Sequence, residues 1–125
     1  MITFTFLAAF SMLLAHELDA VHKHEWRLLP VLKGLPEDRA RSVFIAIHVP
    51  AVAALLWLIG HPGDSVRFQT KLWLDVFMVS HAGLHFALSS HPKYEFHTAL
   101  SRSLIYGCAA TAAIHLGLLL SQNSD

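Results

Sequence analysis

Histidine and carboxylate side chains occur in this sequence at spacings suited to metal binding. His81 and His85 are four residues apart, so on a helix both imidazoles project from one face, about 6 Å apart at Cβ. Imidazole and carboxylate together suit zinc and non-haem iron, and ionisable groups inside apolar segments mark a site by default. We therefore predict a divalent-metal site, for iron or zinc, with the ligands His16, Glu17, His48, His81 and His85.

The chemistry predicted from these residues is that of an intramembrane metalloenzyme acting on a lipid or other apolar substrate at the cytoplasmic leaflet. Glu17 is then a metal ligand or the catalytic general base. The residue types do not separate oxidation at iron from hydrolysis at zinc. Three alternatives remain open: a b-type haem with His16 and His81 as axial ligands, a component of a metal or proton transporter, and a small non-catalytic subunit.

The elements that must position these residues are membrane-spanning helices. Of the 125 residues, 54% are hydrophobic and 14% are charged, against about 25% charged in a typical soluble domain. Apolar segments of roughly 20 residues predict a single all-α domain over residues 1–125, an integral-membrane four-helix bundle. The predicted spans are 2–23, 43–60, 71–90 and 101–120.

The basic residues predict how these spans are oriented. Seven Lys and Arg residues lie on the side that carries the loop after the first span, and only Arg67 and Lys71 lie on the other side. Basic loops stay in the cytoplasm, so both termini are predicted to be extracytoplasmic in a multi-pass protein of the bacterial inner membrane. Eight of the ten histidines fall toward the cytoplasmic side. Four of them lie at the interface, where their participation in the site stays open: His22, His24, His91 and His97.

The composition excludes several other classes of protein. The formal net charge is zero, so nucleic-acid binding is not indicated. A single cysteine, Cys108, excludes an intramolecular disulfide and a multi-cysteine metal cluster. Metal identity and number, and a homo-oligomer or a larger membrane complex as the working assembly, are left open by the sequence.

Several other polar and aromatic residues have ordinary structural interpretations. Asp19 lies four residues before Lys23, and Asp75 lies four residues after Lys71, so both pairs are expected to form ion pairs on a helix. A histidine in the last span, His115, is expected to form a hydrogen bond to another helix. Trp26, Trp57 and Trp73 fit an interfacial aromatic belt.

The segment "HELDAVHKHEWRLLPVL" resembles the opening of a family of small bacterial integral-membrane proteins of unknown function that share a HELDA…HEWR motif. The resemblance extends over "SVFIAIHVP" and "SHAGLHF", and so over most of the chain. A looser similarity links it to the HXXEE group of His/Glu-rich membrane proteins, although an intact H-x-x-E-E is missing. The layout is also similar to membrane fatty-acid desaturases, without their HxxHH boxes. These resemblances imply a membrane protein with a polar His/Glu core and no particular reaction.

Overall fold

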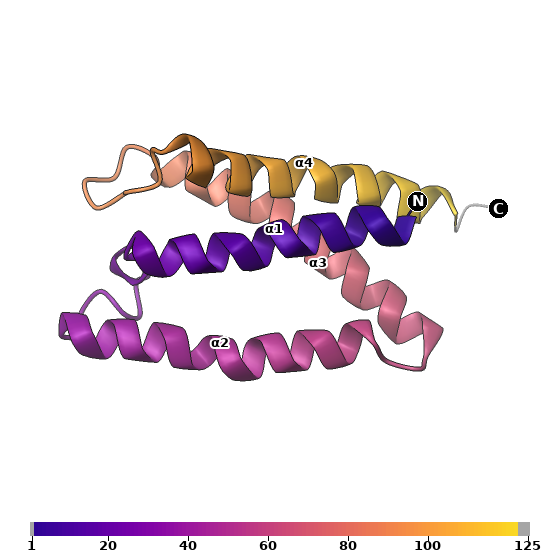
Figure 1. Ribbon diagram of the computed structural model, residues 1–125, viewed down its shortest axis with the longest axis horizontal. Coiled ribbons are helices and arrows are strands. Elements are labelled where there is room, and N and C mark those ends of the chain that lie inside the picture. The colour runs from indigo at the N-terminus through magenta and orange to yellow at the C-terminus, as the bar shows by residue number, and fades with distance from the viewer. Residues whose placement is uncertain (1, 123–125) are drawn as a thin grey trace.

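The computed structural model describes residues 2–122, which fold into four long α-helices and one short 3₁₀ helix (Figure 1). The all-α class predicted from the sequence is confirmed. The elements are α1 (Ile2–His22), η1 (Glu25–Arg27), α2 (Glu37–Ile59), α3 (Asp64–Leu88) and α4 (Ala99–Ser121).

The helices begin where local chemistry favours a helix start. α2 follows Pro36 and carries Glu37 and Asp38 in its first turn, where carboxylates favour the positive end of the helix dipole. At the start of α4, the hydroxyl of Thr98 accepts a hydrogen bond from the amide of Ser101. α2 and α3 begin earlier than the apolar segments 43–60 and 71–90, because their first turns are charged and yet helical.

Three of the four helices, α1, α2 and α4, are long and apolar enough to cross a membrane. This is typical of a multi-pass membrane protein. α3 is long enough but less apolar, since Lys71, Asp75, His81 and His85 interrupt its hydrophobic residues. The predicted span 71–90 therefore stays a prediction, as does the orientation in the membrane.

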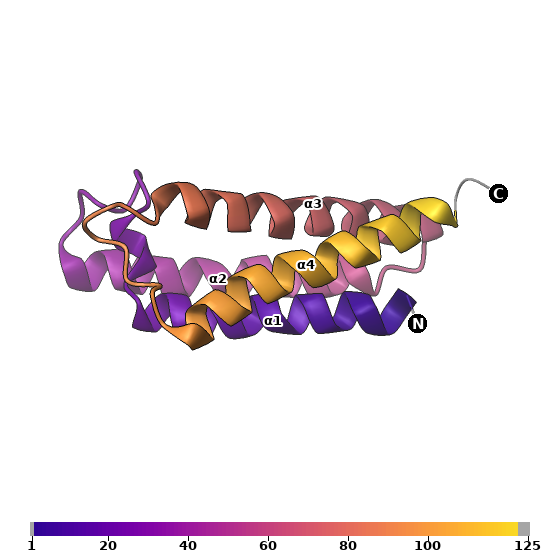
Figure 2. The same cartoon turned by 90° about the horizontal axis from the view of Figure 1, so that it is seen from above.

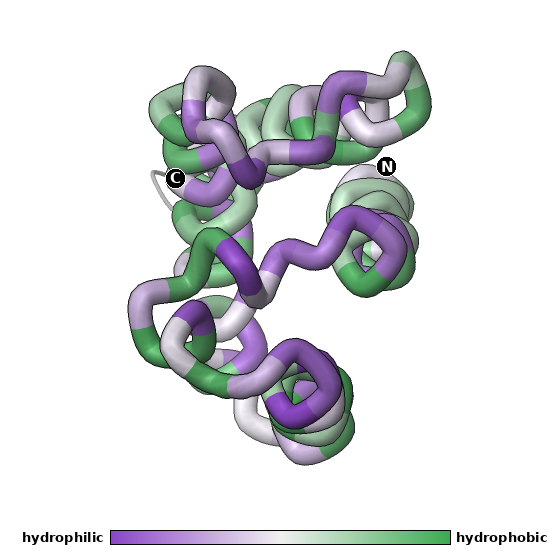
Figure 3. The backbone as a smooth tube through the Cα atoms, turned by 90° about the vertical axis from the view of Figure 1, so that its left-hand side faces the viewer, coloured by the Kyte–Doolittle hydropathy of each residue, from purple (hydrophilic) through white to green (hydrophobic). Residues whose placement is uncertain are grey.

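The helices run alternately in opposite directions. α1 begins and α4 ends at the same end of the bundle, on the right in Figure 1. The opposite end carries η1 and the loop between α3 and α4, as Figure 2 also shows. Figure 3 looks onto this loop end, where hydrophilic and hydrophobic stretches are mixed in the connections. Residues far apart in the sequence therefore meet at one end of the molecule.

The core divides along the helix axes into two apolar clusters. The cluster toward the termini includes Phe6, Leu13 and Met78, and the cluster toward the loops includes Ala20 and Ala82. On α1, His16 lies between Leu13 and Ala20, so a histidine separates the two clusters.

The predicted aromatic belt is wrong for one of its three tryptophans. Trp26 is only 1% exposed and belongs to the loop-end core, whereas Trp57 and Trp73 are exposed. The indole of Trp26 packs beneath the start of α2, where its Nε1–H donates to Glu37. Trp26 therefore fastens the segment after α1 into the bundle core.

Candidate metal centre

Glu25 reaches the interior because the chain turns sharply after α1. His24 adopts a left-handed backbone conformation, with φ 53° and ψ 43°, which few residues other than glycine adopt. The turn leads directly into η1, in which both Glu25 and Trp26 are buried. The Glu25 carboxylate is thereby directed back toward the end of the bundle core.

A network of charged side chains holds η1 in this position. Arg27 forms ion pairs with Glu37 at 3.0 Å and with Glu95 at 2.9 Å, joining η1 to α2 and to the loop before α4. Glu95 also contacts Nδ1 of His24 at 3.0 Å. Hydrogen bonds from His24 and Arg27 hold the pKa of Glu95 below its ordinary value. The left-handed turn is thus fixed by contacts on both sides of it.

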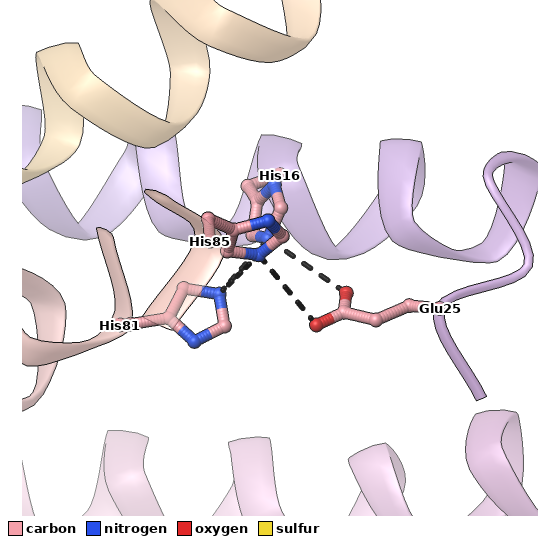
Figure 4. Close-up of side chains that lie close together, drawn as sticks. All are labelled: His16, Glu25, His81 and His85. Atoms are coloured by element: carbon pink, nitrogen blue, oxygen red, sulfur yellow. Dashed lines mark hydrogen bonds and ion pairs between the residues drawn. The ribbon is translucent and has the colours of Figure 1, made fainter. Parts of the chain in front are cut away.

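Three imidazoles and one carboxylate converge at this end of the bundle (Figure 4). Nε2 of His81 lies 3.0 Å from Nε2 of His16 and 3.1 Å from Nε2 of His85. The Glu25 oxygens lie 3.8 Å from His16 Nε2 and 3.7 Å from His85 Nε2. His16, His85 and Glu25 are buried and His81 is half-buried, so the four ligand atoms form one enclosed group.

The imidazoles cannot satisfy one another by hydrogen bonding alone. An Nε2 atom carries either one proton or one lone pair, so it makes only one well-directed N–H···N bond. His81 Nε2 nevertheless contacts two other Nε2 atoms. A cation that accepts all three lone pairs removes this conflict.

The spacing of the four ligand atoms could hold a divalent metal. With metal–ligand bonds of about 2.0–2.1 Å, ligand atoms in a tetrahedral site lie roughly 3.3 Å apart. The four contacts between 3.0 and 3.8 Å bracket this value. Metal-binding histidines commonly form a hydrogen bond through their second ring nitrogen, and His85 Nδ1 lies 3.3 Å from the Tyr94 hydroxyl. Nδ1 of His16 is buried and has no recorded partner.

A bound cation would change the protonation of the Glu25 carboxyl group. Burial, with the negative charges of Glu17 and Asp19, raises the pKa of the Glu25 carboxyl to about 8. Without a metal this carboxyl is therefore mostly protonated at pH 7. Metal binding favours the carboxylate and releases the proton.

The structure brings together three of the five predicted ligands, His16, His81 and His85. Glu17 and His48 contact each other instead, with 2.8 Å between Glu17 Oε2 and His48 Nε2, and they are not part of the group. Their roles as ligands stay predictions.

Glu25 is the candidate ligand that sequence reasoning missed, because it follows the predicted span and no glycine or asparagine at position 24 signals the turn. The only available hint was a carboxylate directly after the histidines of "HKHEW".

The interfacial histidines lie outside the group. His22, His91 and His97 are exposed, and His24 pairs with Glu95. The sequence-based pairing of Asp19 with Lys23 is wrong for the described residues. Between these two residues the structure records only a backbone hydrogen bond, and Asp19 Oδ2 is buried without a hydrogen-bond partner.

A second buried polar pair lies toward the termini. His115 Nδ1 of α4 is 2.6 Å from Asp75 Oδ2 of α3, and neither side chain is exposed. The cross-helix hydrogen bond expected of His115 is confirmed. The expected partner of Asp75 is wrong, because the Lys71 ammonium lies over the Phe6 ring, 5.5 Å from its centroid.

The model of a family of unknown function, DUF6713, matches residues 2–122 of the chain. The chain belongs to the DUF6713 family. The match covers nearly the whole chain and so includes all four residues of the candidate metal-binding group. No curated protein and no solved structure shows significant similarity to this DUF6713 chain. The similarity to HXXEE proteins stays a prediction.

Proposed function

We propose that this chain is an intramembrane metalloenzyme whose divalent metal is held by His16, Glu25, His81 and His85. The observation that carries the proposal is the convergence of three Nε2 atoms and a carboxylate within 4.8 Å of one another. Such a group is costly inside a membrane unless it is compensated. A divalent cation provides that compensation through its own charge.

The donor set favours zinc or iron over metals that prefer sulfur. The Sγ of Cys108 donates to the carbonyl of Ala9 and is not part of the group. Zinc held tetrahedrally by all four residues would have no free position and would be structural, since catalytic zinc keeps one open. Non-haem iron held by histidine and carboxylate residues would retain open positions for a substrate. An enzymatic role therefore favours iron, and the metal supplies Lewis-acid or redox chemistry.

The proposed reaction takes place on a lipid or other apolar molecule. The candidate ligands lie toward the η1 end of the bundle. From the distribution of basic residues, we propose that this end is the cytoplasmic side of a bacterial inner membrane, with both termini extracytoplasmic. We assign Glu17 the role of general base, as its position in α1 predicts; in the structure its carboxyl group lies 2.8 Å from His48 Nε2, outside the ligand group.

The haem alternative is not favoured by the geometry. Two histidines that ligate one haem iron would need room for the macrocycle between them. His16 and His81 are the pair considered for that role, and their Nε2 atoms are 3.0 Å apart. A carboxylate beside both rings is also unlike the apolar walls that haem needs.

Elemental analysis and an absorption spectrum of detergent-purified protein test the proposal. We expect iron or zinc in the wild type and in His61→Ala, and loss of metal in His85→Ala. His61 is a matched control, because its Nδ1 accepts a hydrogen bond from Gly63 in the turn before α3, far from the group in the fold. Wild-type protein without metal after growth in supplemented medium contradicts the proposal. A Soret band would establish haem instead.

A further inference from the structure

A cavity of about 320 Å³ lies between α1 and α2, next to the proposed metal centre along the chain but lined by different residues. Its walls are apolar side chains of the two helices, among them Leu18 and Val52. The polar residues that line it are Glu17 and His48. Both helices are candidate membrane spans, so this volume faces a region in which lipid is the solvent.

The protonation of the polar pair follows from its contacts. Nδ1 of His48 lies 2.5 Å from the carbonyl oxygen of Phe44, which can only accept, so Nδ1 carries a proton. Nε2 of the same ring lies 2.8 Å from Glu17 Oε2. This contact holds one proton, either on the carboxyl or on the ring, and the pair has no net charge in either arrangement.

The pair still offers a hydrogen-bond acceptor to a ligand. The described contacts of Glu17 involve Oε2, and none is recorded for Oε1 within residues 2–122. About 24% of the Glu17 side chain and 31% of the His48 side chain are exposed. A hydroxyl group can donate to the free oxygen, whereas a charged headgroup would enter an apolar space beside a neutral pair and lose its hydration without compensation.

We propose that this cavity binds a neutral, single-chain lipid through its hydroxyl group, with Glu17 and His48 as the polar anchor. The volume lies at the lower end of the roughly 300–1,000 Å³ range of small-molecule sites, which fits one chain better than two. Mostly apolar walls with a few polar groups that fix orientation are the usual composition of such sites. Only the idea that this lipid is the substrate rests on the proposed function. The binding of the lipid in the cavity does not depend on that function.

Photo-crosslinking in lipid nanodiscs tests the proposal on the full chain. The probes are three twelve-carbon chains that carry the same diazirine and end in a hydroxyl, a methyl or a carboxylate. Peptide mapping by mass spectrometry then measures labelling of α1 and α2. We expect the alcohol to label the cavity residues about tenfold more than the alkane or the acid, the preference that a hydrogen bond to a partly buried polar group provides.

Two variants and one control separate the cavity from general lipid contact. Val52→Phe fills the cavity and should abolish the preference for the alcohol. Val49→Phe adds the same bulk to a residue of α2 that is 70% exposed and outside the cavity, and it should retain the preference. The double substitution Glu17→Leu with His48→Leu removes both polar groups together. The alcohol and the alkane should then label this variant equally.

The outcomes also separate this proposal from the metal site. Equal labelling of the wild type by alcohol and alkane overturns the proposal, and so does an unchanged preference in Val52→Phe. Metal content is measured on the same samples. Wild-type protein without metal that still prefers the alcohol refutes the proposed function alone, whereas a metal-loaded protein without the preference refutes the lipid site alone.

Discussion

Replacing Glu25 with glutamine is the sharpest test of the proposed metal centre, because Glu25 was found only in the tertiary structure. Glutamine keeps the size of the side chain and removes the charged oxygen. Glu17→Gln is the matched control, since it makes the same chemical change at a residue predicted from the sequence. In the structure Glu25 lies 3.7 and 3.8 Å from two imidazoles of the group, whereas Glu17 pairs with His48.

The size of the effect can be estimated from the number of ligands. Structural zinc sites with four ligands bind with apparent free energies of about 10–16 kcal/mol at pH 7. Shared equally, this is about 2.5–4 kcal/mol for each ligand, so losing one weakens binding by roughly 10²- to 10³-fold. The amide oxygen of glutamine coordinates a metal weakly, so we expect Glu25→Gln to weaken metal binding by about 100-fold. Glu17→Gln removes only a remote charge, so we expect it to weaken metal binding by less than about fivefold.

The assay measures zinc affinity by competitive titration of chelator-stripped protein in detergent. A separate titration with cobalt follows, because the visible absorption of bound cobalt reports the coordination number. Size-exclusion chromatography of each variant shows whether it is folded. The refuting result is a Kd for Glu25→Gln within a few-fold of the wild type. A larger loss in Glu17→Gln than in Glu25→Gln would instead support the ligand role assigned to Glu17 from the sequence.

Three further results are expected. His115→Leu leaves Asp75 buried without its partner, which should lower the free energy of unfolding by about 3–5 kcal/mol, measured by thermal unfolding. Replacing both residues with leucine should recover much of this stability. Equal losses of stability in the single and double variants would argue against a stabilising pair. Because the pKa of Glu25 is raised to about 8, zinc binding should release a proton and tighten about tenfold for each pH unit up to that value; a Kd independent of pH between 6 and 8 would contradict a carboxylate ligand. In a cysteine-free background, an impermeant thiol reagent applied to intact cells should label Gln122→Cys and leave Leu35→Cys unlabelled, and the reverse pattern would invert the topology.

The lengths of the apolar segments and the spacing of the histidines were enough to predict the helices and three of the four candidate ligands. Apolar segments of the right length predict helices in lipid, because only helices satisfy the backbone without water. The i,i+4 spacing of His81 and His85 places both rings on one helix face whatever the rest of the chain does. Matching depth along antiparallel spans predicts that His16 reaches the same level, and in the structure its Nε2 lies 3.0 Å from Nε2 of His81.

Contacts that depend on how helices rotate, and on how the loops fold, were decided only by the tertiary structure. Glu17 and His16 are neighbours in the sequence, yet they lie about 100° apart around α1; packing directs His16 into the group and Glu17 toward His48. Glu25 enters the group because His24 takes a left-handed conformation. That conformation is stabilised by contacts of the following residues with α2 and with the loop before α4. A turn held by residues distant in sequence has no local signature, so the fourth ligand appears only when the chain is folded.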